Sequence, residues 1–223
     1  MLRFVEEILL LLLRDDNGKF INVTQSSIDR AVAGAVLMEL AMENRIDTDL
    51  DQLVLLDATP VGDSLLDPTL AMIAEGQGAE GEKSDARQWV GQTAQMASGI
   101  REAALDRLVE RGILERQDDR FLWVFRSRRY PTVDGEAERE VKLRIMGVLF
   151  SNEIPSPRDV VIISLAHACG IFSELLSRRE LEQAGARIEQ VRKLDLIGQA
   201  MSQSIQDFEV WLANAAIQGR GFF

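Results

Sequence analysis

Cysteine and histidine are almost absent from this chain of 223 residues, which holds one of each. The single cysteine, Cys169, excludes an internal disulfide and a metal cage built from cysteines. His167 lies two residues away, and side chains at this spacing on a helix diverge, so the two cannot act on one centre. We therefore expect no cofactor, no metal site and no enzyme, and we interpret His167 as a core histidine that donates to a backbone carbonyl.

Basic residues are outnumbered by acidic ones, 25 to 36, which gives a net charge of −11. This balance argues against broad nucleic-acid binding, because such binding neutralises phosphates with Lys and Arg. An anionic partner would have to meet a local basic patch. The longest apolar run, ILLLLL from Ile8 to Leu13, is far shorter than the roughly 20 residues that cross a bilayer. We expect a cytoplasmic protein, either free or on a membrane surface.

The most apolar long segment runs from Ser26 to Ile46 and predicts a helix with almost no polar face. Such a helix is covered by protein on all sides and forms the centre of a helical domain. Ser26 or Ser27 is the expected N-cap. Glu39 lies on the same line as apolar residues, so its carboxylate must be paired or protonated.

The rest of the chain reads mainly as further helices around this centre. Ile113–Arg116 and Arg120–Phe125 instead read as two strands of a β-hairpin joined at residues 117–119. No break in composition divides the chain, so the prediction is one mainly α domain over residues 1–223: compact, built on a buried central helix, with a protruding hairpin. The expected helices are Leu2–Leu13, Ser64–Ala74, Ser98–Arg111, Glu136–Phe150, one opened by Ser156-Pro157, Leu175–Leu194 and Leu196–Ile217, and Asp47–Leu56 is an expected strand.

Arg101 breaks the pattern of the helix expected at Ser98–Arg111, because it falls within the apolar arc beside Leu105 and Leu108. A guanidinium cannot give up its charge, so it must meet an anion or solvent at the rim of a pocket. Two interpretations follow. Arg101 forms an internal ion pair, with Glu39 as one candidate partner, or it belongs to a phosphate site.

A second basic feature follows the hairpin, where Arg126, Arg128 and Arg129 stand close to Trp123. Basic side chains beside aromatic and aliphatic ones suit an anionic membrane surface, where each is worth about 1 kcal/mol. The alternative is a solvated strand end whose arginines balance nearby acids.

Three segments, LMELAMENRI, VLLDATPVGDSLLDPTLAMI and LVERGIL, resemble the Golgi phosphoprotein 3 family. The eukaryotic members of that family are peripheral membrane proteins that bind phosphatidylinositol 4-phosphate. The resemblance implies a compact, mostly helical fold, with a hairpin used in self-association and membrane contact. In this chain the hairpin is Ile113 to Phe125, which makes a homo-oligomer one expectation.

In those eukaryotic members a Trp and three Arg hold the lipid headgroup. The resemblance places the Trp and the first Arg at Thr24 and Ala33, and the other two Arg at Ser98 and Arg101. Only Arg101 keeps the family's residue. These departures indicate a prokaryotic relative.

Three functional hypotheses remain at this stage. The leading one is a non-catalytic adaptor that binds proteins and an anionic phospholipid, phosphatidylinositol 4-phosphate by resemblance. A second is a nucleic-acid-binding regulator like a winged helix, although three acids, Glu102, Asp106 and Glu110, face outward where a recognition helix would be basic. A third is an enzyme with a carboxylate site around Glu39 and Arg101.

Overall fold

The computed structural model describes residues 1–14, 16–49, 52–77, 83–121, 125–133, 135–151 and 153–194. These residues form a compact, mainly helical domain, as the sequence predicts. The predicted helix Leu196–Ile217 lies outside the described residues. The helices are α1 (Phe4–Leu12), α2 (Gln25–Met42), α3 (Asp67–Gln77), α4 (Ala86–Glu110), α5 (Gly135–Phe150), α6 (Pro157–Ala168), α7 (Phe172–Leu175) and α8 (Arg178–Arg192); the strands are β1 (Ile46–Asp49), β2 (Gln52–Leu55), β3 (Lys83–Asp85), β4 (Gln117–Phe121) and β5 (Phe125–Arg129).

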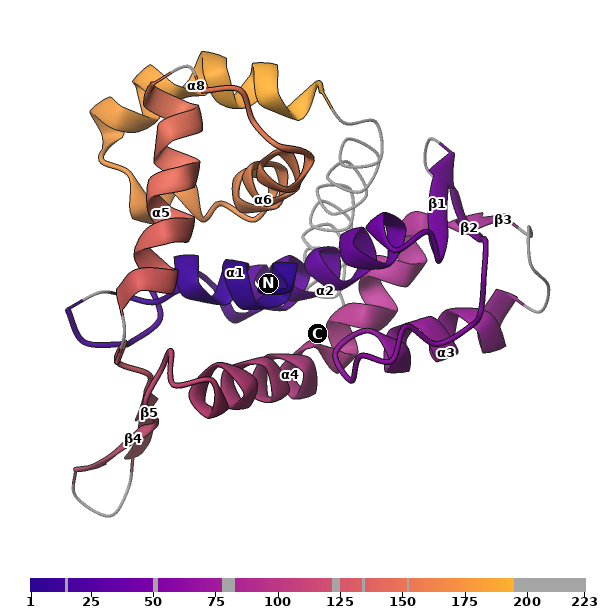
Figure 1. The fold of residues 1–223 in the computed structure, drawn as a ribbon, viewed down its shortest axis with the longest axis horizontal. Coiled ribbons are helices and arrows are strands. Elements are labelled where there is room, and N and C mark those ends of the chain that lie inside the picture. The colour runs from indigo at the N-terminus through magenta and orange to yellow at the C-terminus, as the bar shows by residue number, and fades with distance from the viewer. Residues whose placement is uncertain are drawn as a thin grey trace, which may run out of the picture.

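The helices pack in three tiers, with α1 and α2 in the middle (Figure 1). On one side α5, α6 and α8 cover this pair, and on the other side α4 lies along α2. Every residue of α1 is buried, and so is every residue of α2 from Arg30 to Ala41. Burial on both sides explains why these two segments carry almost no polar face.

The central helix is confirmed, but it begins on a different cap. Thr24 accepts a hydrogen bond from the Ser27 backbone N–H, so the predicted caps Ser26 and Ser27 fall inside the first turn. The helix ends at Met42 rather than Ile46, because Asn44 adopts a positive φ of 54° and turns the chain into β1. Ile46 is thus the first residue of a strand.

The predicted strand Asp47–Leu56 is two strands. β1 and β2 pair antiparallel with Ile46 opposite Leu55, and β3 adds a third strand on the far side of β2. The predicted helix Ser98–Arg111 is likewise longer, because α4 begins at Ala86. Its first half buries Trp89 and Val90, and Gly112 ends it with a φ of 70°, as expected for a C-cap glycine.

The β-hairpin exists and projects from the body of the molecule (Figure 1), but its strands are displaced from the prediction. Gln117 pairs with Arg129 and Phe121 with Phe125, so the chain reverses after Phe121 and not at residues 117–119. An isolated bridge between Leu114 and Thr132 continues the same register at the base. The register is set at this base, where Leu114 is buried, rather than by the polar triplet that resembles a turn.

Candidate functional site

The N-terminal end of α2 carries three hydroxyl side chains on its first turn. Thr24 Oγ1 lies 3.0 Å from Ser27 Oγ and 3.1 Å from Ser26 Oγ, and all three side chains are exposed or partly exposed. The backbone N–H groups of a helix's first turn and its dipole favour negative charge at this end. In an 18-residue helix the end of α2 is therefore suited to an anion.

Arg101 reaches this end of α2 from the neighbouring helix α4. Its Nη1 lies 3.4 Å from Asp29 Oδ1 in the second turn of α2, and 18% of its side chain is exposed. Leu105 and Leu108, beside it on α4, are buried as expected. Arg101 does form an ion pair within the chain, but its partner is Asp29 and not the candidate Glu39, which has other partners.

The four positions singled out by resemblance contribute unequally. Thr24 caps α2 next to the turn that Arg101 approaches, and Ser98 is exposed one turn before Arg101 on α4. Ala33 is completely buried and offers no polar atom. The structure thus brings an arginine, a helix end and hydroxyl groups to one place, although three of the four side chains differ from the resemblance.

One residue near this place, Arg30, has no role in the sequence-based interpretation. It is 5% exposed, and its Nη2 donates a hydrogen bond of 3.3 Å to Ser27 Oγ. Arg30 precedes Ala33 by three residues, so the two lie on the same face of α2. A buried cation thus stands one turn from the position at which the resemblance expects an arginine. The sequence does contain a signal for Arg30, because it is a charged residue inside an otherwise apolar helix.

Glu39 lies in a different part of the molecule, at the junction of α1, α2 and α6. Its carboxylate accepts a hydrogen bond from the Phe4 backbone N–H and lies 3.3 Å from Arg3 Nη1 and 3.6 Å from Arg158 Nη1. The expectation that a buried Glu39 must be paired is therefore confirmed. These contacts link α1, α2 and α6. They give no support to an enzyme site built on Glu39 and Arg101.

The same ion-pair network extends to Asp63, whose carboxylate accepts from Arg3 Nε at 2.8 Å and from Arg107 Nη2 at 2.6 Å. Burial lowers the pKa of Arg3, but its hydrogen bonds to Glu43 and Asp63 outweigh burial and raise that pKa above its usual value. The network lines a hollow of about 390 Å³ at the start of α1. Because each of the arginines named here already faces a carboxylate, the hollow carries no clear charge preference.

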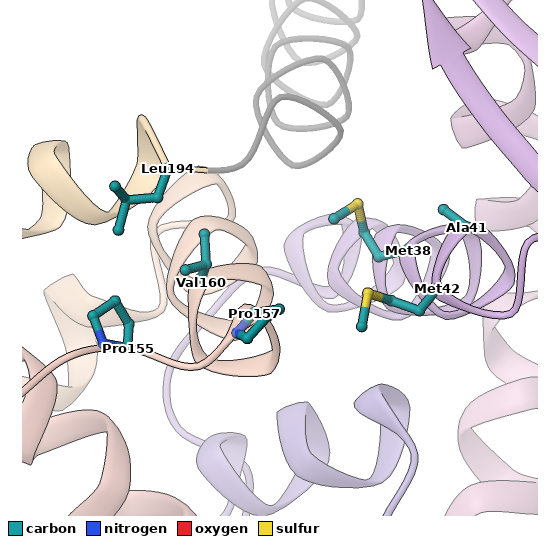
Figure 2. Close-up of a pocket in the computed structure, with 7 residues that line it drawn as sticks. All are labelled: Met38, Ala41, Met42, Pro155, Pro157, Val160 and Leu194. Carbon is teal, nitrogen blue, oxygen red and sulfur yellow. The ribbon is translucent and has the colours of Figure 1, made fainter.

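A separate hollow of about 260 Å³ lies between the end of α2 and the start of α6 (Figure 2). Met38 and Met42 face Pro157 and Val160 across it, and Leu194 stands at its rim. Among the described residues its lining contains no charged side chain, so it offers an anion no cation to pair with.

The cluster Arg126, Arg128 and Arg129 belongs to β5 itself rather than to a segment after the hairpin. In register, Arg128 stands opposite Asp118 and Arg126 opposite Arg120. Trp123 lies outside the described residues. Of the three arginines the structure describes only the Arg129 side chain, which is partly buried and has an interaction partner. The role of this cluster on an anionic surface therefore stays a prediction.

His167 is partly buried at the end of α6, and the contact that the structure gives its ring is not to a backbone carbonyl. Its Nε2 lies 3.6 Å from Glu189 Oε1 of α8. Burial and the nearby charge of Arg192 lower the pKa of His167, although Glu189 opposes them. Within the described part of the chain, no group of three or more His, Cys, Asp or Glu side chains could hold a metal ion.

The sequence of this chain matches a known protein family over most of its length. The model of Golgi phosphoprotein 3 (GPP34) matches residues 4–208, which includes α2, α4 and the hairpin β4–β5 that follows α4. The chain belongs to the Golgi phosphoprotein 3 family. The predicted resemblance is thereby confirmed.

Two fungal relatives show how far the similarity extends. Vacuolar protein sorting-associated protein 74 of Schizosaccharomyces pombe is 29% identical over 228 residues, covering 85% of this chain and 66% of the relative. The protein of the same name from Eremothecium gossypii is 23% identical over 217 residues, covering 82% of this chain and 63% of the relative. This chain thus spans just under two thirds of the length of these relatives. Among the described residues no helix combines the length and apolar character needed to cross a membrane.

Proposed function

We propose that this member of the Golgi phosphoprotein 3 family is a non-catalytic adaptor that binds membranes through the phosphate of an anionic phospholipid headgroup. The headgroup binds where Arg101 of α4 meets the N-terminal end of α2. Protein partners bind elsewhere on the domain, and the hairpin β4–β5 is the expected surface for self-association. Family membership supports the adaptor role, and the geometry of the described residues supports the lipid site.

The observation that carries the lipid site is the position of Arg101. Its side chain is 18% exposed, and its Nη1 lies 3.4 Å from Asp29 Oδ1, in the second turn of the helix whose first turn carries hydroxyl side chains. A guanidinium and the N-terminal end of a helix both favour phosphate oxygens, and here the two lie within the first two turns of α2. Three other arginines, Arg3, Arg107 and Arg158, are held by largely buried carboxylates of the same chain.

The described structure favours this function over the two alternatives. Glu102, Asp106 and Glu110 are exposed along α4, so this helix presents acids where a nucleic-acid-binding helix needs cations. Glu39 pairs with Arg3 and Arg158 while Arg101 contacts Asp29, and this separation counts against the carboxylate site that the enzyme hypothesis needs.

Vesicle co-sedimentation tests the lipid site. The vesicles are phosphatidylcholine with a rising fraction of phosphatidic acid, and a second series carries phosphatidylinositol 4-phosphate, the headgroup that the resemblance implies. We expect Arg101→Ala to weaken binding about tenfold or more, since hydrogen bonds to charged groups are worth about 1.5–3 kcal/mol. The matched control is Arg178→Ala, which removes a 94% exposed arginine from α8 and should change binding by less than about twofold.

Two results would contradict the proposal. One is that Arg101→Ala binds both vesicle series as tightly as Arg178→Ala does. The other is that the unaltered protein binds neither series better than pure phosphatidylcholine. Thermal melting of each variant shows whether it is folded, since a partly exposed arginine should be removable without loss of the fold.

A further inference from the structure

Arg101 is already occupied by an anion of its own chain. Asp29 Oδ1 lies 3.4 Å from Arg101 Nη1, and the same oxygen accepts a hydrogen bond of 2.7 Å from Gln25 Nε2. Gln25 is the first residue of α2, so this bond ties the carboxylate to the helix end described above. The side chains of Asp29 and Arg101 are 27% and 18% exposed, so solvent and a headgroup can both reach the pair.

We propose that Asp29 is an autoinhibitory counter-ion that competes with the lipid phosphate for Arg101. This inference rests on the proposed function and adds a means of regulating the same site. Nothing in the family resemblance assigns a role to position 29.

The physical basis is that a phosphate and the Asp29 carboxylate seek the same guanidinium. A headgroup that approaches Arg101 must either displace Asp29 or accept a negative charge beside it, and both reduce the net attraction. The cost is modest, because a partly exposed pair in water contributes little. Asp29 thus lowers affinity without abolishing it, and the site responds to a high local density of anionic lipid rather than to a single headgroup.

The geometry also explains why the competitor can be removed without loss of the fold. Gln25 and Asp29 lie on the outer side of the first turns of α2, and neither belongs to the buried core. Asparagine has the shape of aspartate and keeps an oxygen that can accept the Gln25 hydrogen bond. Asp29→Asn therefore removes the charge and leaves the local contacts in place.

The test is a double-mutant cycle of vesicle binding with the full chain, on phosphatidylcholine vesicles that contain phosphatidic acid. We expect Asp29→Asn to bind up to about fivefold more tightly than the unaltered protein, the limit set by the value of an exposed ion pair. In the Arg101→Ala background the same change should have no effect, because the cation for which Asp29 competes is gone.

The matched control is Glu182→Gln on α8. It removes the same charge from another exposed ion pair, since Glu182 lies 3.3 Å from Arg178. A gain for Asp29→Asn no larger than for Glu182→Gln would overturn the inference. An equal gain with and without Arg101 would also overturn it, because it would show a general charge effect.

Failure of this inference can be told apart from failure of the proposed function. If Arg101→Ala binds no less tightly than Arg178→Ala, the lipid site itself is wrong. If Arg101→Ala weakens binding but Asp29→Asn does not strengthen it, only the role of Asp29 is wrong.

Soluble glycerol 3-phosphate is a second probe, which separates a lipid headgroup from a free phosphate as the ligand. If it binds the protein as tightly as the vesicles do, the natural ligand is a free phosphate, and the membrane part of the proposed function falls while the competition at Arg101 stands.

Discussion

Glu39 is 4% exposed, and arginines from two other parts of the fold lie against its carboxylate. The sequence alone shows that Glu39 needs a partner, because it lies on an apolar line of α2. It cannot show which partner, because Arg3 and Arg158 come from the cap of α1 and from α6, and tertiary packing brings them together. For the same reason the sequence offers Glu39 only as one candidate partner of Arg101, and the partner in the structure is Asp29. Asp29 was visible in the sequence, but only the packing of α4 along α2 places it there.

The role of Glu39 can be tested at this scale by Glu39→Gln. The change leaves Arg3 and Arg158 near a neutral amide, so we expect the free energy of unfolding to fall by about 3 kcal/mol, as for other broken buried pairs. Urea denaturation measures it. The control is Glu43→Gln, which removes a 37% exposed carboxylate that contacts the same Arg3 and should cost less than about 1 kcal/mol. Equal losses for the two variants would show that the burial of Glu39 does not matter.

At the scale of elements, the sequence predicts helices better than their ends. The first half of α4 was missed because its buried residues are interrupted by small and polar ones, so its apolar stripe is weak. The hairpin was expected four or five residues too early, because a polar triplet at 117–119 resembles a turn. Its true register depends on its base. There the Tyr130 N–H donates a hydrogen bond of 2.8 Å to the carbonyl of Gly18, which belongs to the loop after α1. Contacts of this kind, between distant segments, have no local signature.

Gly18 is the residue on which this contact between elements depends. Its φ is 61°, and an added Cβ would lie 2.3 Å from the Pro131 backbone nitrogen. We expect Gly18→Ala to lower the free energy of unfolding by at least about 2 kcal/mol, because both the strained backbone and the clash with another backbone act against it. Chemical denaturation provides the measurement.

A second glycine serves as the control. Gly99 lies on the exposed side of α4, and an added Cβ would meet nothing within 4 Å. Gly99→Ala should therefore raise stability by about 0.5–1 kcal/mol, the usual gain from replacing glycine by alanine within a helix. A destabilisation by Gly99→Ala, or no loss in Gly18→Ala, would contradict the described geometry.

At the scale of the whole molecule, the proposed function lets an acidic protein meet an anionic membrane through one local site at Arg101. Most of the arginines whose contacts are described face carboxylates of the same chain, which is what a net charge of −11 leads one to expect. Arg101 also faces a carboxylate, Asp29, and this pair lies within two turns of the N-terminal end of α2, which favours negative charge. Attraction to an anionic membrane would therefore act at this site, and the protein as a whole need not carry a positive net charge.

The candidate site was only partly predictable from the sequence. The family resemblance pointed to Arg101 and Thr24, and both lie at the proposed site. It pointed equally to Ala33, which is buried and apolar, and it gave no indication of Arg30 or Asp29. Arg30 lies one helical turn before Ala33, so its charge is on the same face of α2 but at a different position in the sequence. A comparison made position by position misses such a residue, and the packed helices reveal it.

Hydrogen exchange of the full chain, with and without vesicles that contain phosphatidic acid, tests the central claim most directly. A headgroup bound at Arg101 should slow amide exchange in the first turns of α2, residues 25–30, and in residues 98–105 of α4. Exchange in α8 should not change. Protection confined to α8, or to the hairpin β4–β5 alone, would contradict the claim that the phospholipid binds where α4 meets the end of α2.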